Sequence, residues 1–243
     1  MKLTILGMNG PYPAPGGCCS GYLVQSGGTN LQLDLGCGTL PALLARVPLT
    51  ELTALVITHW HGDHCSDVLP LLYALESAVA AHRREPLPVF GVDGGASPVF
   101  AAVKACPAVA LRVVEPGETI RVGDFTIATL AARHPVRAMM LRLTQGGKTL
   151  CYTGDTNTQP CLTAYAQGAD LLLCDGLFPE SVWSEEKPHL SAAHCARLAR
   201  DAGVKRLIIT HLNPDIDARK LLREASAIYP DAELARCGMT AEL

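Results

Sequence analysis

Short apolar runs alternate with turn-forming clusters along most of the chain. Ten of these runs have the length of half-buried or core strands, and several end in Gly or His. Their sequences are KLTILG, GYLVQSG, NLQLDLG, ALVITH, LPVFGV, FTIATLAA, MMLRLTQ, KTLCYTG, DLLLCDG and RLIITHL. The clusters SGGTN and TQGGKT are typical of hairpin turns. The pattern therefore predicts ten strands and two hairpins.

Five other segments predict helices, at 66–84, 97–105, 159–168, 191–203 and 217–229. Ser66 or Asp67 is a candidate N-cap of the first helix. In the fourth, Ser191 is a plausible N-cap and Gly203 a plausible stop. Strands dominate the first part of the chain, and strands and helices mix afterwards. This order predicts an α/β fold in which two sheets pack face to face with helices outside.

Length and composition narrow the class of protein. The chain has 243 residues, 49% hydrophobic and 18% charged, which suits one globular domain over residues 1–243. No internal repeat or low-complexity linker divides it. The net charge of −3 offers no broad footprint for nucleic acid or an anionic membrane. No apolar run reaches ~18 residues and the N-terminal one is too short for a signal peptide, so we expect a soluble cytoplasmic protein.

Ten cysteines are present, but no C-x-x-C spacing occurs. Many lie inside apolar runs, such as Cys151 and Cys174. We interpret them as small buried hydrophobes in a reducing compartment. Cys65, beside His64, receives the same interpretation.

One polar stretch, THWHGDHCSD, directly follows a buried strand. Its ligand-type side chains are His59, His61, Asp63 and His64. His59 and His61 point to the same side of an extended chain, and Gly62 permits a turn that brings the second pair back. Such crowding is costly unless a divalent metal compensates for it. Imidazole and carboxylate ligands favour zinc, with manganese or iron as alternatives.

The H-x-H-x-D-H motif resembles that of the metallo-β-lactamase superfamily. The residues that match the family's remaining motifs are His134, Asp155 in a GD turn, His211 at the end of a late strand, and Asp34 in a D-x-G turn. These elements occur in order, and the likeness covers nearly the whole chain. The resemblance implies a four-layer αββα sandwich, with two mixed sheets and helices on the outer faces.

The resemblance also implies a centre of two divalent metal ions that hydrolyses substrate with a bridging hydroxide. His59, His61 and His134 would hold one ion, and Asp63, His64 and His211 the other. Asp155 would bridge the two, and Asp63 counts as catalytic as well as a ligand. Asp34 would fix the tautomer of a ligand histidine, although an aspartate that only forms the turn remains an alternative.

A further histidine, His189, resembles one that precedes an alanine-rich helix in the ribonuclease Z branch. There it pairs with a glutamate, and Asp175 occupies that place in this chain. We assign His189 a catalytic role as general acid or oxyanion stabiliser, with a loop contact as the alternative. His82 and His194 are interpreted as helix-surface residues.

The full ligand set and His189 favour a phosphodiester substrate. Only 20 residues, 135–154, separate His134 from Asp155, too few for the RNA-gripping arm of the long ribonuclease Z branch. We therefore expect a small-molecule phosphodiester such as a cyclic nucleotide, with no strong nucleic-acid signal and no membrane partner. The alternatives are an acyl hydrolase acting on a lactone, thioester or β-lactam, a ribonuclease Z-like RNA processing enzyme, and a non-enzymatic metal- or redox-sensing protein. A homodimer stays open.

Overall fold

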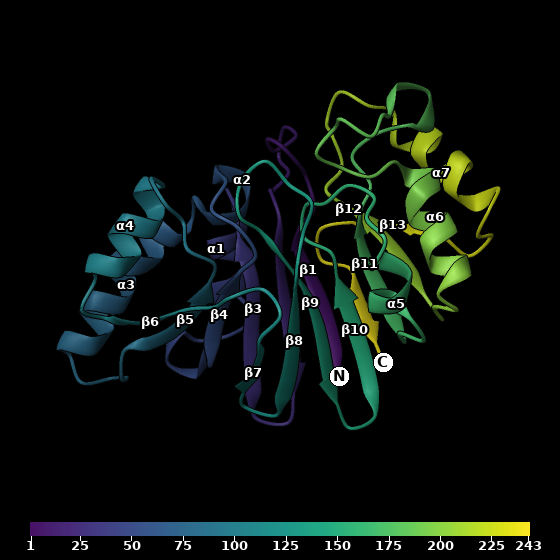
Figure 1. Cartoon of the computed structure of the whole chain (residues 1–243). Coiled ribbons are helices and arrows are strands. Elements are labelled where there is room, and N and C mark those ends of the chain that lie inside the picture. The colour runs from purple at the N-terminus through teal and green to yellow at the C-terminus, as the bar shows by residue number, and fades with distance from the viewer.

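The computed structural model describes residues 1–243 and contains two seven-stranded mixed sheets. The first sheet has the order β14-β1-β2-β3-β4-β5-β6, and the second has the order β13-β12-β11-β10-β9-β8-β7. In Figure 1 the two sheets stand side by side in the middle of the molecule, with helices on both outer sides. The predicted αββα sandwich is confirmed.

The first sheet is antiparallel through β1, β2 and β14 and parallel from β3 to β6. Its strands are β1 (Lys2–Gly7), β2 (Gly21–Ser26), β3 (Thr29–Leu35), β4 (Ala54–Ile57), β5 (Leu87–Gly91), β6 (Val109–Val113) and β14 (Thr240–Glu242). The helices of this half are α1 (Thr39–Leu44), α2 (Gly62–Cys65), α3 (Val68–Ala80) and α4 (Pro98–Ala105), with a 3-10 turn at Leu49–Glu51. Helices α3 and α4 cover the outer face on the left of Figure 1.

The second sheet is antiparallel from β7 to β10 and parallel from β10 to β13. Its strands are β7 (Thr119–Val122), β8 (Phe125–Ala131), β9 (Met139–Gln145), β10 (Lys148–Tyr152), β11 (Leu171–Asp175), β12 (Leu207–Thr210) and β13 (Glu233–Leu234). Helices α5 (Leu162–Ala166), α6 (Ala192–Asp201) and α7 (Ala218–Ser226) cover its outer face on the right of Figure 1, and a 3-10 turn spans Glu180–Val182.

Two hydrophobic cores follow from this layering. The larger joins the facing sides of both sheets and extends under the helices of the first half, with members such as Leu33, Val56 and Leu141. The smaller lies between the second sheet and helices α5 to α7, with members such as Leu172, Ala196 and Leu221. The strands β4, β11 and β12 are buried along their whole length, because each has neighbours on both edges and cover on both faces.

All ten predicted strands and all five predicted helices are present, but the helices α3, α5 and α7 are shorter than expected. The hairpin turns are confirmed, since Gln145 pairs with Lys148 across a two-residue turn in which Gly146 and Gly147 both have positive φ. Asp67 precedes α3 but its side chain does not cap it, accepting a hydrogen bond from the Leu40 amide instead. Ser191 does cap α6.

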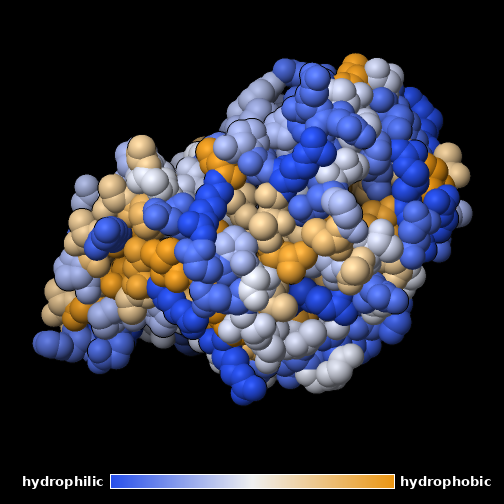
Figure 2. All heavy atoms as spheres, viewed as in Figure 1, coloured by the Kyte–Doolittle hydropathy of each residue, from blue (hydrophilic) through white to orange (hydrophobic).

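The pattern missed the strands β6, β7, β13 and β14 and the helix α1. These elements are short, with two to six residues each, and the four strands lie at or next to a sheet edge, so each offers few positions from which a period can be read. In Figure 2 a continuous hydrophobic patch lies on the left of the molecule, where Figure 1 labels β5, β6, α3 and α4. Val113 of β6 is exposed. No helix is long and apolar enough to cross a membrane.

Candidate metal centre

The ligand-type side chains meet where strands of both sheets end. In Figure 1 this is the end of the sheets near helix α2, toward the top of the molecule. His59 follows β4, His134 follows β8, Asp155 follows β10 and His211 follows β12. Parallel strands carry their carboxyl ends at the same edge, so residues far apart in the chain meet there. All seven ligand residues expected from the sequence gather at this edge, within two overlapping clusters.

The first cluster contains three imidazoles and one carboxylate, those of His59, His61, His134 and Asp155. His61 Nδ1 lies 3.1 Å from His59 Nε2 and 3.1 Å from His134 Nε2. The Asp155 Oδ2 atom lies 3.4 Å from His59 Nε2 and 4.0 Å from His134 Nε2. Nitrogens held at ~2.0–2.1 Å around a tetrahedral zinc ion lie roughly 3.3 Å apart, so the spacing of these atoms fits an ion.

The second cluster contains Asp63, His64, Asp155 and His211. His211 Nε2 lies 3.0 Å from Asp63 Oδ2 and 3.4 Å from Asp155 Oδ1. His64 Nε2 lies 3.1 Å from the same Asp155 Oδ1. Asp155 therefore directs Oδ2 toward the first cluster and Oδ1 toward the second, which is the geometry of a bridging carboxylate.

Buried polar atoms without a hydrogen-bond partner mark the second cluster. His64 Nε2 and Asp155 Oδ1 are fully buried, and neither makes a well-aligned hydrogen bond. The short distance between His64 Nε2 and Asp155 Oδ1 is thus a contact between atoms that point at a common space, not at one another. Buried polar atoms in folded proteins are nearly always satisfied, so a cation between them is the simplest way to satisfy this pair.

Burial and mutual charge shift the pKa values of the cluster in opposite directions. Burial lowers the pKa of His59 well below its ordinary value, and His64 lowers it further. Burial also acts to lower the pKa of His64 and His211, but Asp155 and neighbouring carboxylates outweigh it, and the pKa of His211 rises to about 10. For Asp155 burial acts to raise the pKa, but His211, His64 and His59 hold it well below the usual range. The carboxylate is therefore kept ionised in a buried site, as a metal ligand must be.

Asp34 supports the second cluster from the end of β3. Its side chain is fully buried and accepts from the Thr58 amide at 2.7 Å and from the Tyr152 hydroxyl at 2.7 Å. Its Oδ2 lies 2.7 Å from His64 Nδ1, so the other ring nitrogen of His64 faces the cluster. The expected pairing of Asp34 with a ligand histidine is thus present. Thr58 and Tyr152 were missed, because their contacts with Asp34 cross from one strand or sheet to another and leave no local pattern.

Strained backbone places two of these side chains. Asp34 has a φ of 49° and His211 a φ of 58°, in the left-handed region that costs residues with a Cβ roughly 1–2 kcal/mol. A Cβ on Gly10 would lie 2.0 Å from His211 Nε2. A Cβ on Gly36 would lie 1.9 Å from the Asp63 carbonyl oxygen. The two glycines therefore allow neighbouring chain segments to press directly against the second cluster.

His189 lies beside both clusters without completing either. Its Nδ1 is 2.7 Å from Asp175 Oδ2, so the carboxylate at the end of β11 orients the ring. The ring stacks on His211 at 4.8 Å and lies 5.5 Å from the ring of His134. The Trp183 indole donates to the His189 carbonyl at 3.0 Å and holds the loop. The shorter Asp175 therefore makes the contact expected of the glutamate in the resembling branch.

Cys65, His82 and His194 are other residues whose roles the sequence predicts. Cys65 is buried with its thiol donating to the His61 carbonyl, as expected of a structural cysteine. His82 is exposed. His194 is not a simple surface residue: it is half-buried, its ring packs at a tilt against Trp183 with centroids 3.9 Å apart, and its Nδ1 lies 2.7 Å from Ser191 Oγ. The 3-10 turn that brings Trp183 over α6 was not foreseen from the pattern.

Comparison with known proteins places these features in a family. Residues 33–212 match the model of the beta-lactamase superfamily domain. The probable metallo-hydrolase YhfI of Bacillus subtilis is 31% identical over 245 residues, covering 100% of each chain. Its crystal structure superposes with a TM-score of 0.94 at 30% identity, covering 100% of this chain and 99% of that one. A ribonuclease Z of Lachnoclostridium phytofermentans is 26% identical, covering 97% of this chain and 95% of the relative.

Proposed function

This chain belongs to the metallo-β-lactamase superfamily and is a metallo-hydrolase, and from that premise we propose that it hydrolyses small phosphodiesters, such as cyclic nucleotides, at a centre of two zinc ions. In this proposal the first ion is held by His59, His61 and His134. The second is held by Asp63, His64 and His211. Asp155 bridges the two.

The donor set supports two ions over one. Each cluster contributes its own imidazoles, and the two oxygens of Asp155 face different clusters. A pair of divalent ions ~3.5–4 Å apart lowers the pKa of a water molecule and stabilises charge on the oxygens of a phosphoryl group. The chain's own part is to orient the donors: Asp34 fixes the ring of His64, and Asp175 fixes the ring of His189.

The position of His189 beside the two clusters is the observation that favours a phosphodiester over a carbonyl substrate. An alkoxide leaving group of a phosphodiester needs a proton, whereas a good acyl leaving group does not. In this proposal His189, whose Nδ1 contacts Asp175, donates the proton to the leaving oxygen from its other ring nitrogen, Nε2. The buried Asp175 stays ionised, because His189 and His211 outweigh the effect of burial and lower its pKa, so a carboxylate is present to orient the His189 ring.

The short connection between two strands of the second sheet supports a small substrate. The strands β9 and β10 between His134 and Asp155 are joined by Gly146 and Gly147 alone, with no arm that could grip RNA. The relative of L. phytofermentans with the name ribonuclease Z supports phosphodiester chemistry, while the short hairpin favours a substrate smaller than structured RNA.

A substrate panel tests the proposal. Zinc-loaded protein is given bis-p-nitrophenyl phosphate, a cyclic nucleotide, a structured precursor RNA, a lactone, a thioester and a β-lactam, and kcat/KM is measured for each. We expect the two small diesters to be the best substrates. A clear preference for any carbonyl substrate or for the RNA would overturn the proposal and leave only the family assignment.

A further inference from the structure

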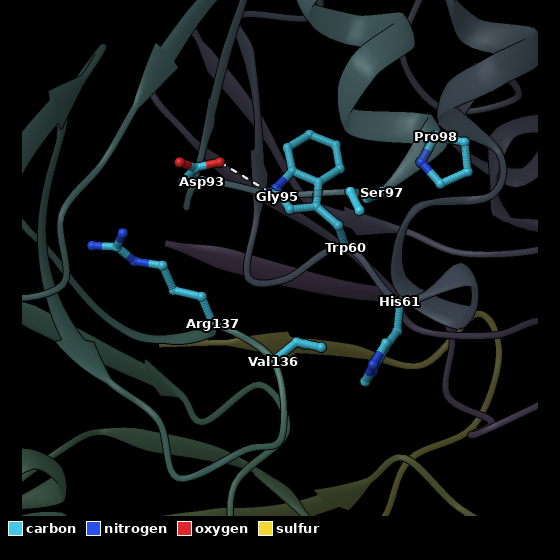
Figure 3. A pocket seen from close by; sticks show the side chains of 10 residues that line it. Trp60, His61, Asp93, Gly95, Ser97, Pro98, Val136 and Arg137 are labelled. Atoms are coloured by element: carbon cyan, nitrogen blue, oxygen red, sulfur yellow. Dashed lines mark hydrogen bonds between the residues drawn. The ribbon is translucent and has the colours of Figure 1, made fainter.

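A hollow of about 470 Å³ opens directly beside the first ligand cluster. Three segments form it: the end of the β4 loop with Trp60 and His61, the loop from β5 to α4, and the loop after β8 with Val136 and Arg137. Figure 3 shows Trp60 and Asp93 on one side and Val136 and Arg137 on the other, with His61 at the near end. His61 belongs to both the hollow and the ligand cluster, so a group attached to phosphorus at the cluster reaches the hollow directly.

The wall that contains Trp60 is rigid. Its indole nitrogen donates to the Val92 carbonyl at 2.8 Å, and its ring packs against Phe100 at 5.1 Å between centroids. A Cβ on Gly94 would lie 2.7 Å from the Trp60 ring, so the loop must have glycine there to lie flat on the indole. A pre-formed wall of this kind loses little entropy when it binds a flat ring.

The hollow has a polar end and an apolar body. Its accessible wall is mostly apolar, and its volume lies within the ~300–1,000 Å³ common for small-molecule sites. At one end Asp93 Oδ1 accepts from the Gly95 amide at 2.9 Å, drawn as the dashed line in Figure 3, which leaves Oδ2 open to a ligand donor. The guanidinium of Arg137 lies in an ion pair with Glu115. Asp93 is the carboxylate that lines the hollow and can accept from a ligand donor.

We propose that this hollow, the Trp60 pocket, binds the nucleobase of the phosphodiester substrate, with an amino group of the base donating to Asp93. This inference rests on the proposed function, since it takes the phosphate to lie at the two ligand clusters. A nucleobase has a flat ring that fits the apolar part of the hollow and an amino group that can donate to Asp93. A plain alkyl or acyl chain would fill the apolar part but could not donate a hydrogen bond to the exposed Asp93 carboxylate, so it would use only part of the site.

Three variants test the pocket. Ala96→Trp fills it, because Ala96 lines it and is exposed. Asp93→Asn keeps an oxygen for the Gly95 amide but offers the base a donor as well as an acceptor. The matched control is Glu186→Gln, which changes an exposed acid that lines a separate hollow on the other side of His134. The substrates are cyclic AMP, cyclic UMP, which has no amino group on its base, and methyl p-nitrophenyl phosphate, which has no base.

We expect Ala96→Trp to lower kcat/KM for cyclic AMP by about tenfold or more and to leave the methyl diester within about twofold. The wild-type protein should have a higher kcat/KM for cyclic AMP than for cyclic UMP. In Asp93→Asn this ratio should be about tenfold smaller, the value of one hydrogen bond to a charged acceptor. Glu186→Gln should change neither ratio. Equal losses on cyclic AMP and the methyl diester in Ala96→Trp, no loss at all, or a selectivity change in Glu186→Gln alone would overturn the pocket assignment.

A binding measurement separates this inference from the proposed function. Titration calorimetry of adenosine 5′-monophosphate with wild-type and Ala96→Trp protein needs no turnover. Binding that Ala96→Trp abolishes supports the pocket even if the wild-type protein hydrolyses no diester, in which case only the proposed function fails. Hydrolysis of the methyl diester without nucleotide binding rejects the pocket and leaves the proposed function standing.

Discussion

At the scale of single residues, the candidate groups His64, His189 and His211 each lie against a carboxylate that orients the ring. Asp175 lies between His189 and His211, with its oxygens 2.7 Å and 3.5 Å from their Nδ1 atoms. Asp34 holds His64 in the same way. Partners of this kind fix which ring nitrogen faces the metal or the substrate. In the proposed function the ligand residues hold metal, whereas His189 would act on the leaving group.

His189→Ala should keep both metal ions and lose turnover. We expect a loss of ~10²–10⁴ in kcat on a cyclic nucleotide, whose alkoxide needs a proton, and a smaller loss on a nitrophenyl diester, whose leaving group does not. The measurement is kcat on both substrates with metal content determined on the same sample. His82→Asn is the control, because His82 is exposed and asparagine tolerates its left-handed backbone. Equal losses on both substrates would reject the general-acid role.

Asp34→Asn should weaken zinc binding at the second cluster by about 10- to 100-fold, the usual effect of removing a carboxylate behind a ligand histidine. Tyr152→Phe removes only one of the hydrogen bonds to the same carboxylate and should cost less. Competition titrations against a chelating dye give both affinities. If the two variants bind zinc as tightly as the wild-type protein, Asp34 does no more than form the turn.

At the scale of elements, the sequence pattern predicts the buried strands well and the edges poorly. β4, β11 and β12 are continuous apolar runs, and the site residues stand out because polar groups interrupt such runs abruptly. At the sheet edges β6 has a mostly exposed face and β7 has only four residues, so neither forms a continuous apolar run. The Trp60 pocket could not be predicted at all, since Trp60, Asp93 and Arg137 come from three loops whose proximity depends on the tertiary fold.

The hairpin turns offer a matched test of the backbone geometry. Gly147 has a φ of 75°, so Gly147→Ala should destabilise the protein by roughly 1–2 kcal/mol. Gly28 lies in the equivalent hairpin between β2 and β3, has no positive φ and has open space around its Cβ position. Gly28→Ala should therefore be neutral or slightly stabilising. Chemical denaturation of both variants measures the difference, and equal effects would show that the turn geometry is wrong.

At the scale of the whole molecule, the two ligand clusters join the two sheets. His59, His61, Asp63 and His64 follow a strand of the first sheet, whereas His134, Asp155 and His211 follow strands of the second. Metal ions bound by these residues would link the two sheets, and only in the folded state. Binding of this kind stabilises the folded protein in proportion to the logarithm of metal concentration over Kd.

Removal of metal should therefore lower the melting temperature. At a metal concentration a thousandfold above Kd the stabilisation is about 4 kcal/mol, and at roughly 2–4 °C per kcal/mol for a chain of this size we expect a drop of about 10 °C. Calorimetry before and after chelation measures it, and adding zinc back should restore the original value. A melting temperature that stays constant while metal is lost would show that the centre does not hold the sheets together.

Elemental analysis of the wild-type protein and of Asp155→Ala tests whether the site holds two metal ions bridged by Asp155. One Asp155 oxygen faces each cluster, so this variant should lose both ions while any single histidine variant loses about one. We expect close to two zinc ions per wild-type chain. One ion or none in the wild-type protein, with no uptake when zinc is added, or two ions retained in Asp155→Ala, would contradict a centre of two metals bridged by this carboxylate.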